Sequence, residues 1–182
     1  MRKLIFAINT TLDGCVDHDK QTADEETHQY FTELLRGVDL QVFGRKTYEL
    51  MVPFWPEVAR SQSMDPASNE FARVFDSIDK LVFSRTLTNV EDPRTKIARS
   101  GLREEVLKMK SEPGKGIVVG GVDVATQLIE LRLVDEYRFV VGPSVVGAGR
   151  RLFETVNSPL QLRLVDSRFF KSGSVALRYV NG

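Results

Sequence analysis

The sequence predicts a single α/β domain on a mixed, mostly parallel sheet, with an antiparallel C-terminal hairpin and helices on both faces. Its 182 residues suit one domain with a substantial core. Up to residue 131, short apolar runs alternate with segments of helical spacing, which is typical of parallel strands joined by helices. Beyond residue 135, strand-like segments follow with few helical signals between them, which favours antiparallel pairing.

Seven apolar runs are expected to form strands, because each is short and rich in branched or aromatic side chains. In chain order they are Lys3–Asn9, Leu40–Gly44, Lys80–Ser84, Gly116–Gly121, Glu136–Gly142, Leu160–Phe170 and Ser174–Val180. The first ends near Asp13-Gly14, a turn signal. Lys171-Ser172-Gly173 joins the last two runs, and this short polar connection predicts a β-hairpin.

Helices are expected between the early strands, because apolar residues recur there at intervals of three and four. Thr22 and Glu25 form a capping-box signature at the start of the first helix. A second helix is expected over Lys46–Met51. The apolar stripes of the others are Phe31, Leu34, Leu35 and Val38; Phe71, Val74, Phe75 and Ile78; Leu102, Val106 and Met109; and Val124, Ala125, Leu128 and Leu131. The stretch 53–67, with three prolines, is expected to be a loop.

Composition narrows the function classes. Lysine plus arginine and aspartate plus glutamate both number 25, so the balanced charge does not favour nucleic acid or an anionic membrane as a partner. No apolar run approaches the roughly 20 residues of a membrane helix. The single cysteine, Cys15, excludes an intrachain disulfide and indicates a reducing compartment, so we expect a cytoplasmic protein. With two histidines and one cysteine, no metal site is expected.

Three strand ends run into glycine, hydroxyl or cationic side chains, where a helix is expected to begin or nearly begin. They are Gly44-Arg45-Lys46-Thr47, Ser84-Arg85-Thr86 and Gly120-Gly121-Val122-Asp123. Helix N-termini offer free N–H groups to phosphate, and glycine lets the phosphate approach the backbone. Each motif alone is more often a turn or cap, but three at one sheet edge suit a dinucleotide. The cations Arg45, Lys46 and Arg85 favour NADP over NAD.

The chain resembles the dihydrofolate reductase superfamily, in the branch of the C-terminal reductase domain of the riboflavin-synthesis deaminase–reductase. The matching segments are "NTTLDG" (9–14), "VFGRKTYE" (42–49), "KLVFSRTL" (80–87), "VVGGVDVATQLIE" (118–130) and "LVDEYRFVVGPSVVGAGRRLFE" (133–154). They occur in the family's order and span nearly the whole chain. The resemblance implies a dihydrofolate reductase-like three-layer fold, NADPH as the hydride donor and a homodimer.

The resemblance also assigns residues to the site. For the cofactor it implies Asn9 and Thr10 beside the nicotinamide, and three phosphate-binding groups: Gly44, Arg45, Lys46 and Thr47; Ser84, Arg85 and Thr86; and Gly120, Gly121, Val122, Asp123, Val124 and Ala125. Leu12, Asp13 and Gly14 match the start of the mobile loop beside the substrate. Phe31 and Trp55 are further candidates for substrate contact, although core packing explains such aromatic side chains equally well.

Two departures from the family pattern narrow the substrate. Folate-reducing members carry a carboxylate sixteen residues before the glycine of G-R-x-T, and here that position is His28. We therefore do not expect a true folate reductase. One cysteine also cannot supply the zinc site of the deaminase half. His28 and Asp13 are the candidate proton donors, with helix packing for His28 and a simple turn for Asp13 as the alternatives.

The leading hypothesis is an NADPH-dependent oxidoreductase that reduces a C=N or C=O group of a small pterin-, pyrimidine- or sugar-imine-like substrate. It would resemble the 5-amino-6-(5-phosphoribosylamino)uracil reductases or the dihydrofolate reductases. One alternative is a non-catalytic NADP(H)-binding module that keeps the cofactor site without a competent substrate pocket. Another is a structural α/β domain whose basic turns bind nothing.

Overall fold

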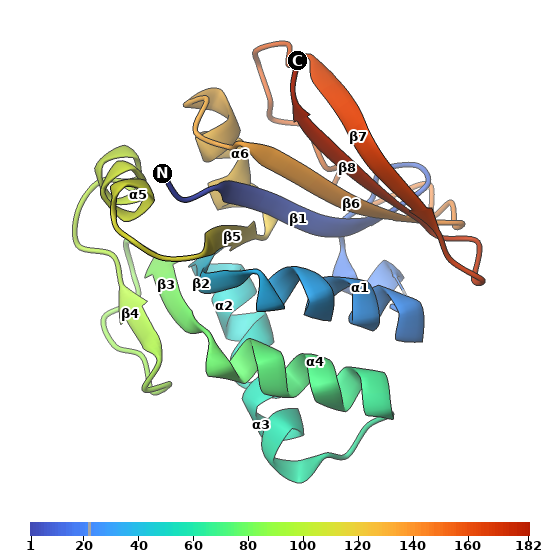
Figure 1. The fold of residues 1–182 in the computed structure, drawn as a ribbon, viewed down its shortest axis with the longest axis horizontal. Coiled ribbons are helices and arrows are strands. Elements are labelled where there is room, and N and C mark those ends of the chain that lie inside the picture. Colours follow the sequence, from blue (N-terminus) through green and yellow to red (C-terminus); the bar gives the residue numbers. More distant parts are fainter. Residues whose placement is uncertain (22) are drawn as a thin grey trace.

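A single eight-stranded sheet forms the centre of the structure, a computed structural model that describes residues 1–21 and 23–182 (Figure 1). The strand order is β4-β3-β2-β5-β1-β6-β8-β7. The strands are β1 (Leu4–Thr11), β2 (Val38–Gly44), β3 (Asp79–Phe83), β4 (Thr95–Ile97), β5 (Gly116–Gly120), β6 (Glu136–Gly142), β7 (Leu162–Phe169) and β8 (Val175–Asn181). The helices are α1 (Glu25–Arg36), α2 (Arg45–Met51), α3 (Phe54–Ser61), α4 (Pro66–Ser77), α5 (Leu102–Ser111) and α6 (Val122–Glu130), with a 3-10 turn over His18–Lys20.

The sheet topology confirms the predicted fold class. Strands β1 to β6 pair in parallel, whereas β8 pairs antiparallel with both β6 and β7. The predicted hairpin joins β7 to β8, with Gly173 at φ +87°, a conformation that glycine adopts without strain. Every strand predicted from the sequence is therefore present, within a residue or two of its expected ends.

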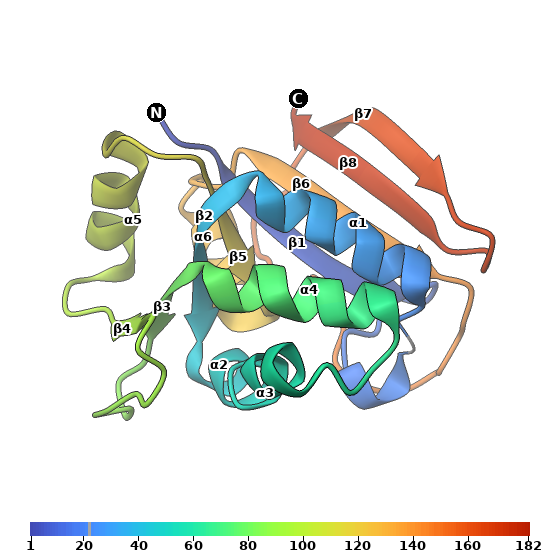
Figure 2. The ribbon, with the colours of Figure 1, turned by 60° about the horizontal axis from the view of Figure 1, so that its bottom comes forward.

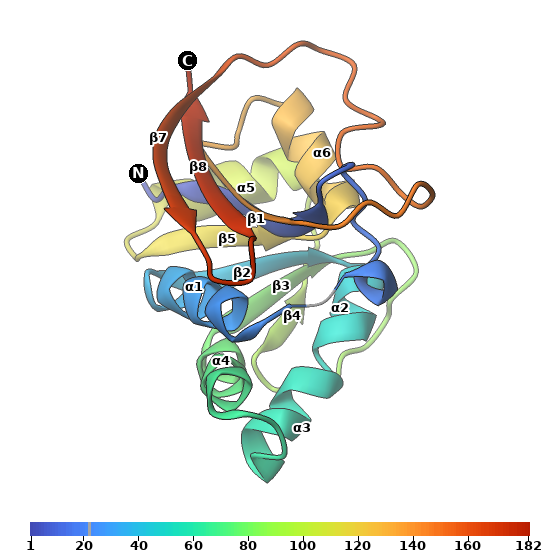
Figure 3. The same cartoon turned by 90° about the vertical axis from the view of Figure 1, so that its right-hand side faces the viewer.

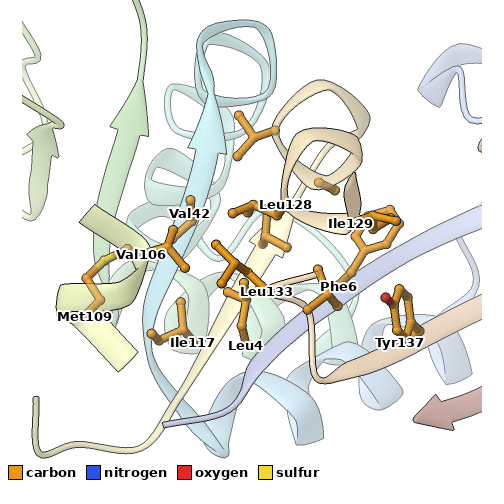
Figure 4. Packing of buried hydrophobic residues seen from close by; sticks show 14 of the residues in the cluster. Leu4, Phe6, Val42, Val106, Met109, Ile117, Leu128, Ile129, Leu133 and Tyr137 are labelled. Carbon is orange, nitrogen blue, oxygen red and sulfur yellow. The ribbon is translucent and has the colours of Figure 1, made fainter. Parts of the chain in front are cut away.

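Helices cover both faces of the sheet, as predicted. Helices α1 and α4 lie side by side against one face, and α5 and α6 lie on the other (Figures 2 and 3). Two large clusters of buried apolar side chains correspond to these faces. The α5/α6 side buries residues such as Val106, Leu128 and Ile129 against the sheet (Figure 4), and the α1/α4 side buries residues such as Leu34 and Phe75. This double coverage explains why the central strands are apolar on both faces.

Some of the predicted boundaries were wrong. The stretch 53–67 is not a loop, because it holds α3 and the first turn of α4. Proline is tolerated at the start of a helix, and Asp65 caps α4 through the N–H groups of Ala67 and Ser68, with Pro66 as the first helical residue. Val38 belongs to β2 rather than to the first helical stripe, since α1 ends at Arg36.

Two further expectations concern helix starts. The capping-box residue Thr22 lies outside the described residues; α1 is capped by Asp24, whose carboxylate accepts a hydrogen bond from the Thr27 N–H at 2.7 Å. No helix follows β3 directly, because the chain turns at Ser84 and continues to the short edge strand β4, which was not predicted.

Strands β1 and β5 separate at the end where the predicted site lies. Their pairing runs from Leu4↔Ile117 to Phe6↔Val119, whereas β1 continues beside β6 as far as Thr11↔Gly142. The sheet therefore opens between β1 and β5 at the carboxyl ends of its parallel strands, where α/β proteins commonly bind ligands. No helix in the described part of the chain is long and apolar enough to cross a membrane.

Candidate functional site

A small cavity of about 40 Å³ lies where β2 and β5 end. We call its lining the glycine cradle: Gly44, Lys46, Thr47, Gly120, Gly121, Val122, Asp123, Val124 and Arg150. The two strand ends are adjacent because Phe43 pairs with Gly120 in the sheet. The structure thus brings together two of the three motifs that the sequence predicted to bind phosphate.

Glycines are required in the cradle because other side chains lie very close to their Cα atoms. A Cβ on Gly121 would lie 2.1 Å from Thr47 Oγ1, and Gly121 has φ +79°. A Cβ on Gly44 would lie 3.2 Å from a methyl carbon of Val124. These contacts let the starts of α2 and α6 pack closely around the cavity. Because α2 has only seven residues, its contribution is the Lys46 charge and the Thr47 hydroxyl more than a helix dipole.

The charges of the cradle come from Lys46, Asp123 and Arg150. Arg150 and Asp123 form an ion pair. This hydrogen bond, with the nearby Lys46 charge, holds the pKa of Asp123 below its usual value despite partial burial. Arg45, in contrast, is exposed, pairs with Glu49 at 3.0 Å on the same helix and does not line the cradle. Ala125, predicted to bind the cofactor, is fully buried in the core and also lies outside the lining.

The third predicted motif lies outside both cavities. Ser84 Oγ accepts hydrogen bonds from the N–H groups of Thr86 and Leu87, at 3.2 and 2.9 Å, and so closes a turn. Arg85 and Thr86 are exposed on that turn. Since Phe83 pairs with Gly44, the turn follows the strand next to β2 at the same edge of the sheet. A helix N-terminus does not contribute here, and any phosphate contact would depend on side chains.

A larger cavity of about 340 Å³ lies at the ends of β1 and β6, against the first turn of α1. We call it the polar cavity, because nine of its twelve lining residues have polar side chains. Its lining is Asn9, Thr10, Lys20, Gln21, Asp24, Thr27, Val140, Gly142, Pro143, Ser144, Ser172 and Ser174. The sequence predicted Asn9 and Thr10 at the site. Residues from α1, the loop after β6 and the β7–β8 hairpin were missed, because no local pattern relates them to β1.

The polar cavity suits a ligand with many hydrogen-bonding groups. Its only charged side chains among the described residues are Lys20 and Asp24. Burial raises the pKa of Asp24, but hydrogen bonds from Ser172 and Thr27 outweigh this effect and leave the pKa below its usual value. Asp24 is therefore ionised near neutral pH, and the cavity presents one carboxylate, one ammonium group, amides and hydroxyls.

Asp13 is committed to holding two loops together. Its carboxylate accepts hydrogen bonds from Thr11 Oγ1 at 2.6 Å and from the Gly147 N–H at 2.9 Å, and it lies 2.9 Å from Arg151. These contacts hold the pKa of Asp13 well below its usual value. An ionised carboxylate with these partners has no proton to donate near neutral pH. These contacts favour a positioning role for Asp13 over the predicted role of proton donor.

The neighbours of Asp13, Leu12 and Gly14, line neither cavity. The Leu12 side chain is 67 % exposed, and its N–H donates to Ser144 O at 2.8 Å. Gly14 has φ +81° and its carbonyl accepts from the Leu152 N–H. Both residues therefore contribute backbone contacts to the loop after β6. The substrate contact that the resemblance implies for them stays a prediction, since neither residue lines a cavity.

His28 and Trp55 meet, but between helices rather than in a cavity. Their rings lie edge to face with centroids 5.6 Å apart, and Phe71 of α4 contacts both. His28 Nδ1 is 3.1 Å from Ser68 Oγ, and burial lowers the pKa of His28 although Asp65 and Asp24 oppose it. Phe31, also on α1, is partly buried and packs against two clusters of buried apolar side chains. His28 and Trp55 join α1, α3 and α4, and Phe31 packs in the core, so packing, the alternative role, is what their contacts support.

Arg150 and Arg151 are the residues of the candidate site that sequence reasoning missed most clearly. They belong to the loop between β6 and β7, in the matched segment "GPSVVGAGRRLFE". Pro143 and Ser144, at the start of this loop, line the polar cavity, while Arg150 lines the glycine cradle. One loop therefore reaches both cavities. Two adjacent arginines in a glycine-rich loop were the available signal.

The sequence matches a known protein family over most of its length. The family described as the RibD C-terminal domain matches residues 2–176. The uncharacterized protein YyaP of Bacillus subtilis (strain 168) is 33 % identical over 183 residues, which covers 98 % of this chain and 94 % of YyaP.

Solved structures share the fold. A putative riboflavin biosynthesis protein from Shewanella sp. PV-4 superposes with a TM-score of 0.75 at 20 % identity and 99 % coverage of both chains. A deaminase/5-amino-6-(5-phosphoribosylamino)uracil reductase from Thermotoga maritima gives 0.70 at 18 % identity, covering all of this chain and 57 % of the other. The predicted dihydrofolate reductase-like fold and the predicted resemblance are thus confirmed.

Proposed function

This chain belongs to the RibD C-terminal domain family, and we propose that it is an NADPH-dependent reductase acting on a C=N or C=O group of a small pterin-, pyrimidine- or sugar-imine-like substrate. The observation that carries the proposal is the position of the glycine cradle and the polar cavity at one edge of the sheet, connected by a single loop. The dinucleotide would supply a hydride from its reduced nicotinamide ring.

The residues of the cradle fit a dinucleotide. Gly44, Gly120 and Gly121 line the cavity and let the two strand–helix turns pack closely around it, while Thr47 adds a hydroxyl and Lys46 a charge. Asn9 and Thr10, in the polar cavity, are at the carboxyl end of β1, where this strand separates from β5. A cofactor that extends from the cradle toward β1 would place its reactive end beside the polar cavity. The polar lining there would then bind and orient the substrate.

Reduction of a C=N or C=O group also requires a proton. Asp13 is ionised, and His28 lines neither cavity and has a lowered pKa. Asp24, which does line the polar cavity, is also ionised near neutral pH. We therefore propose water entering the polar cavity as the proton source.

Titration with NADPH, followed by its fluorescence, tests cofactor binding. We expect a dissociation constant in the micromolar range or below, and no binding there would exclude both the reductase and the non-catalytic module. The oxidation of NADPH is then followed by absorbance across a panel of pterins, pyrimidines, imines and carbonyl compounds. Binding without oxidation of NADPH by any of them would favour the non-catalytic module.

Two threonines of α1 provide a matched pair for the substrate site. Thr27 and Thr32 are both 3 % exposed, but only Thr27 lines the polar cavity, while Thr32 donates to the His28 carbonyl. We expect Thr27→Val to lower kcat/KM for the substrate about 10-fold while NADPH affinity is kept. Thr32→Val should leave both unchanged. Equal effects of the two substitutions would contradict the assignment of the polar cavity.

A further inference from the structure

Arg150 lies in the glycine cradle but comes from a distant part of the chain. The other lining residues belong to the two strand–helix turns around Gly44 and Gly120, whereas Arg150 comes from the loop after β6. We propose that Arg150 binds the diphosphate that NADPH and NADH share, and that Asp123 holds its guanidinium in place before a dinucleotide binds. This inference rests on the proposed function, because it assigns a residue to the same cofactor site.

The backbone of Arg150 is fixed on both sides. Its N–H donates to Asp17 Oδ2 at 3.1 Å, and its carbonyl accepts from the Val16 N–H at 2.9 Å. The next residue, Arg151, pairs with Asp13. These contacts attach the loop to the segment that follows β1. The guanidinium of Arg150 is therefore presented to the cradle from an anchored position, which reduces the entropy lost when it binds a ligand.

The charge of the cradle depends on Arg150. Among its lining residues, Lys46 contributes +1 and Asp123 contributes −1, so these two sum to zero. Arg150 raises the sum to +1. A diphosphate carries negative charge, and a neutral cradle with a carboxylate inside it would bind such a group poorly. Arg150 is thus the cation that makes the cradle attractive to a diphosphate.

The guanidinium has two carboxylate neighbours and is partly exposed to the cavity side of the loop. It pairs with Asp123, lies 3.8 Å from Glu154, and its side chain is 31 % exposed. Arginine presents several N–H groups in a planar fork, which matches two phosphate oxygens or a carboxylate. A bound diphosphate would accept hydrogen bonds from the same fork. Asp123 then acts as a placeholder that keeps Arg150 in the cradle and competes with the ligand.

Arg150→Ala tests this assignment by fluorescence titration with both NADPH and NADH. We expect the affinity for each dinucleotide to fall by a similar factor, about 10- to 100-fold, because the diphosphate is common to both. Arg150→Lys, which keeps the charge but loses the fork, should give a smaller loss. Arg36→Ala is the control, since Arg36 pairs with Glu70 between α1 and α4, outside the cradle.

The Asp123→Asn variant distinguishes two roles for Arg150: binding the diphosphate, or only stabilising α6 through the ion pair. The asparagine keeps an oxygen that accepts from the Arg150 guanidinium but removes the negative charge that competes with the diphosphate, so both dinucleotides should bind more tightly than to the wild type. If Arg150 only braces α6 through the ion pair, Asp123→Asn and Arg150→Ala would weaken binding together and lower Tm together, which would overturn the inference. Unchanged affinity in Arg150→Ala would overturn it as well. If the wild type binds neither dinucleotide, the proposed function itself fails. If the wild type binds and Arg150→Ala binds equally well, only the role of Arg150 fails.

Discussion

Some residues of the glycine cradle tolerate few substitutions, and Gly121 is the clearest case. Its φ of +79° strains any other residue, and a Cβ would lie 2.1 Å from Thr47 Oγ1. We predict that Gly121→Ala destabilises the protein by about 2 to 4 kcal/mol, measured by urea unfolding. Gly147→Ala is the control, because Gly147 has φ +73° with no atom near its Cβ position, and about 1 kcal/mol is expected there. Equal losses would mean that the close contact with Thr47 is relieved without cost.

Arg45 and Arg85 are exposed cations beside the cradle but outside its lining. On the proposed function they contact the 2′-phosphate, which NADPH has and NADH lacks. We predict that Arg45→Ala with Arg85→Ala weakens NADPH binding about 10- to 100-fold and NADH binding much less. Titration of both dinucleotides measures the difference. Similar losses for the two cofactors would refute this assignment, and the contrast with Arg150→Ala distinguishes the two kinds of phosphate contact.

At the scale of elements, His28 makes the stability of the packing between α1, α3 and α4 depend on pH. Burial lowers its pKa, although Asp24 and Asp65 face it. The unfolded chain therefore binds a proton more readily than the folded one, so this contribution to stability is complete above about pH 6.5 and is lost as the pH falls through the folded pKa. We predict that Tm falls more in the wild type than in His28→Asn between about pH 7.5 and about pH 5.5. Parallel pH profiles would show that His28 is not the titrating group.

The loops after β1 and β6 form a second coupled unit, held by Asp13. Its lowered pKa means that the ionised carboxylate stabilises the fold above the unfolded pKa of about 4, and that this contribution is lost as the pH falls through the folded pKa. We predict that Asp13→Asn lowers Tm at pH 7, and that its Tm approaches that of the wild type under acidic conditions. A constant difference down to low pH would indicate that the charge of Asp13 is not what holds the loops.

At the scale of the whole molecule, the C-terminal hairpin leaves an apolar edge. Strand β7 is the last strand of the sheet, and its exposed apolar side chains include Leu164, Val165 and Phe169, which is 79 % exposed. An open edge strand with such side chains readily pairs with another strand. The homodimer expected from the family resemblance remains a prediction, and we propose that two copies meet through β7 around a twofold axis.

Light scattering after size exclusion tests this proposal. We predict a dimeric wild type and a monomeric Leu164→Glu/Phe169→Glu variant, because the two carboxylates that each copy would bury at the interface would lack partners. Leu107→Glu is the control, since Leu107 is also an exposed leucine, at 40 %, and its helix, α5, lies across the molecule from β7 (Figure 1). A monomeric wild type would contradict the dimer, and a dimeric double variant would place the interface elsewhere.

Most of the fold could be predicted from local patterns. The strand at Glu136–Gly142 has the predicted ends, because a run of buried side chains with a glycine at its end leaves few alternatives. The wrong predictions lie in segments where the local sequence signals for helix, strand and loop conflict or are too short. Prolines suggested a loop at 53–67, although Pro53, Pro56 and Pro66 stand where helices begin and their missing N–H groups are not needed. The edge strand β4 has only three residues, too few to show a periodicity.

The sequence by itself determined the mixed sheet and the cradle motifs, because strand, turn and glycine are local signals that repeat wherever a helix follows a strand. It also indicated the family, through the resemblance of five segments in the family's order. Only the tertiary structure decided the rest of the site. It committed Asp13 to Arg151, buried His28 between helices, brought Ser172 and Ser174 of the hairpin to α1, and delivered Arg150 to the cradle. Such contacts join residues more than 20 positions apart. Which residues meet depends on how the helices and strands pack, and the sequence around each residue does not show this.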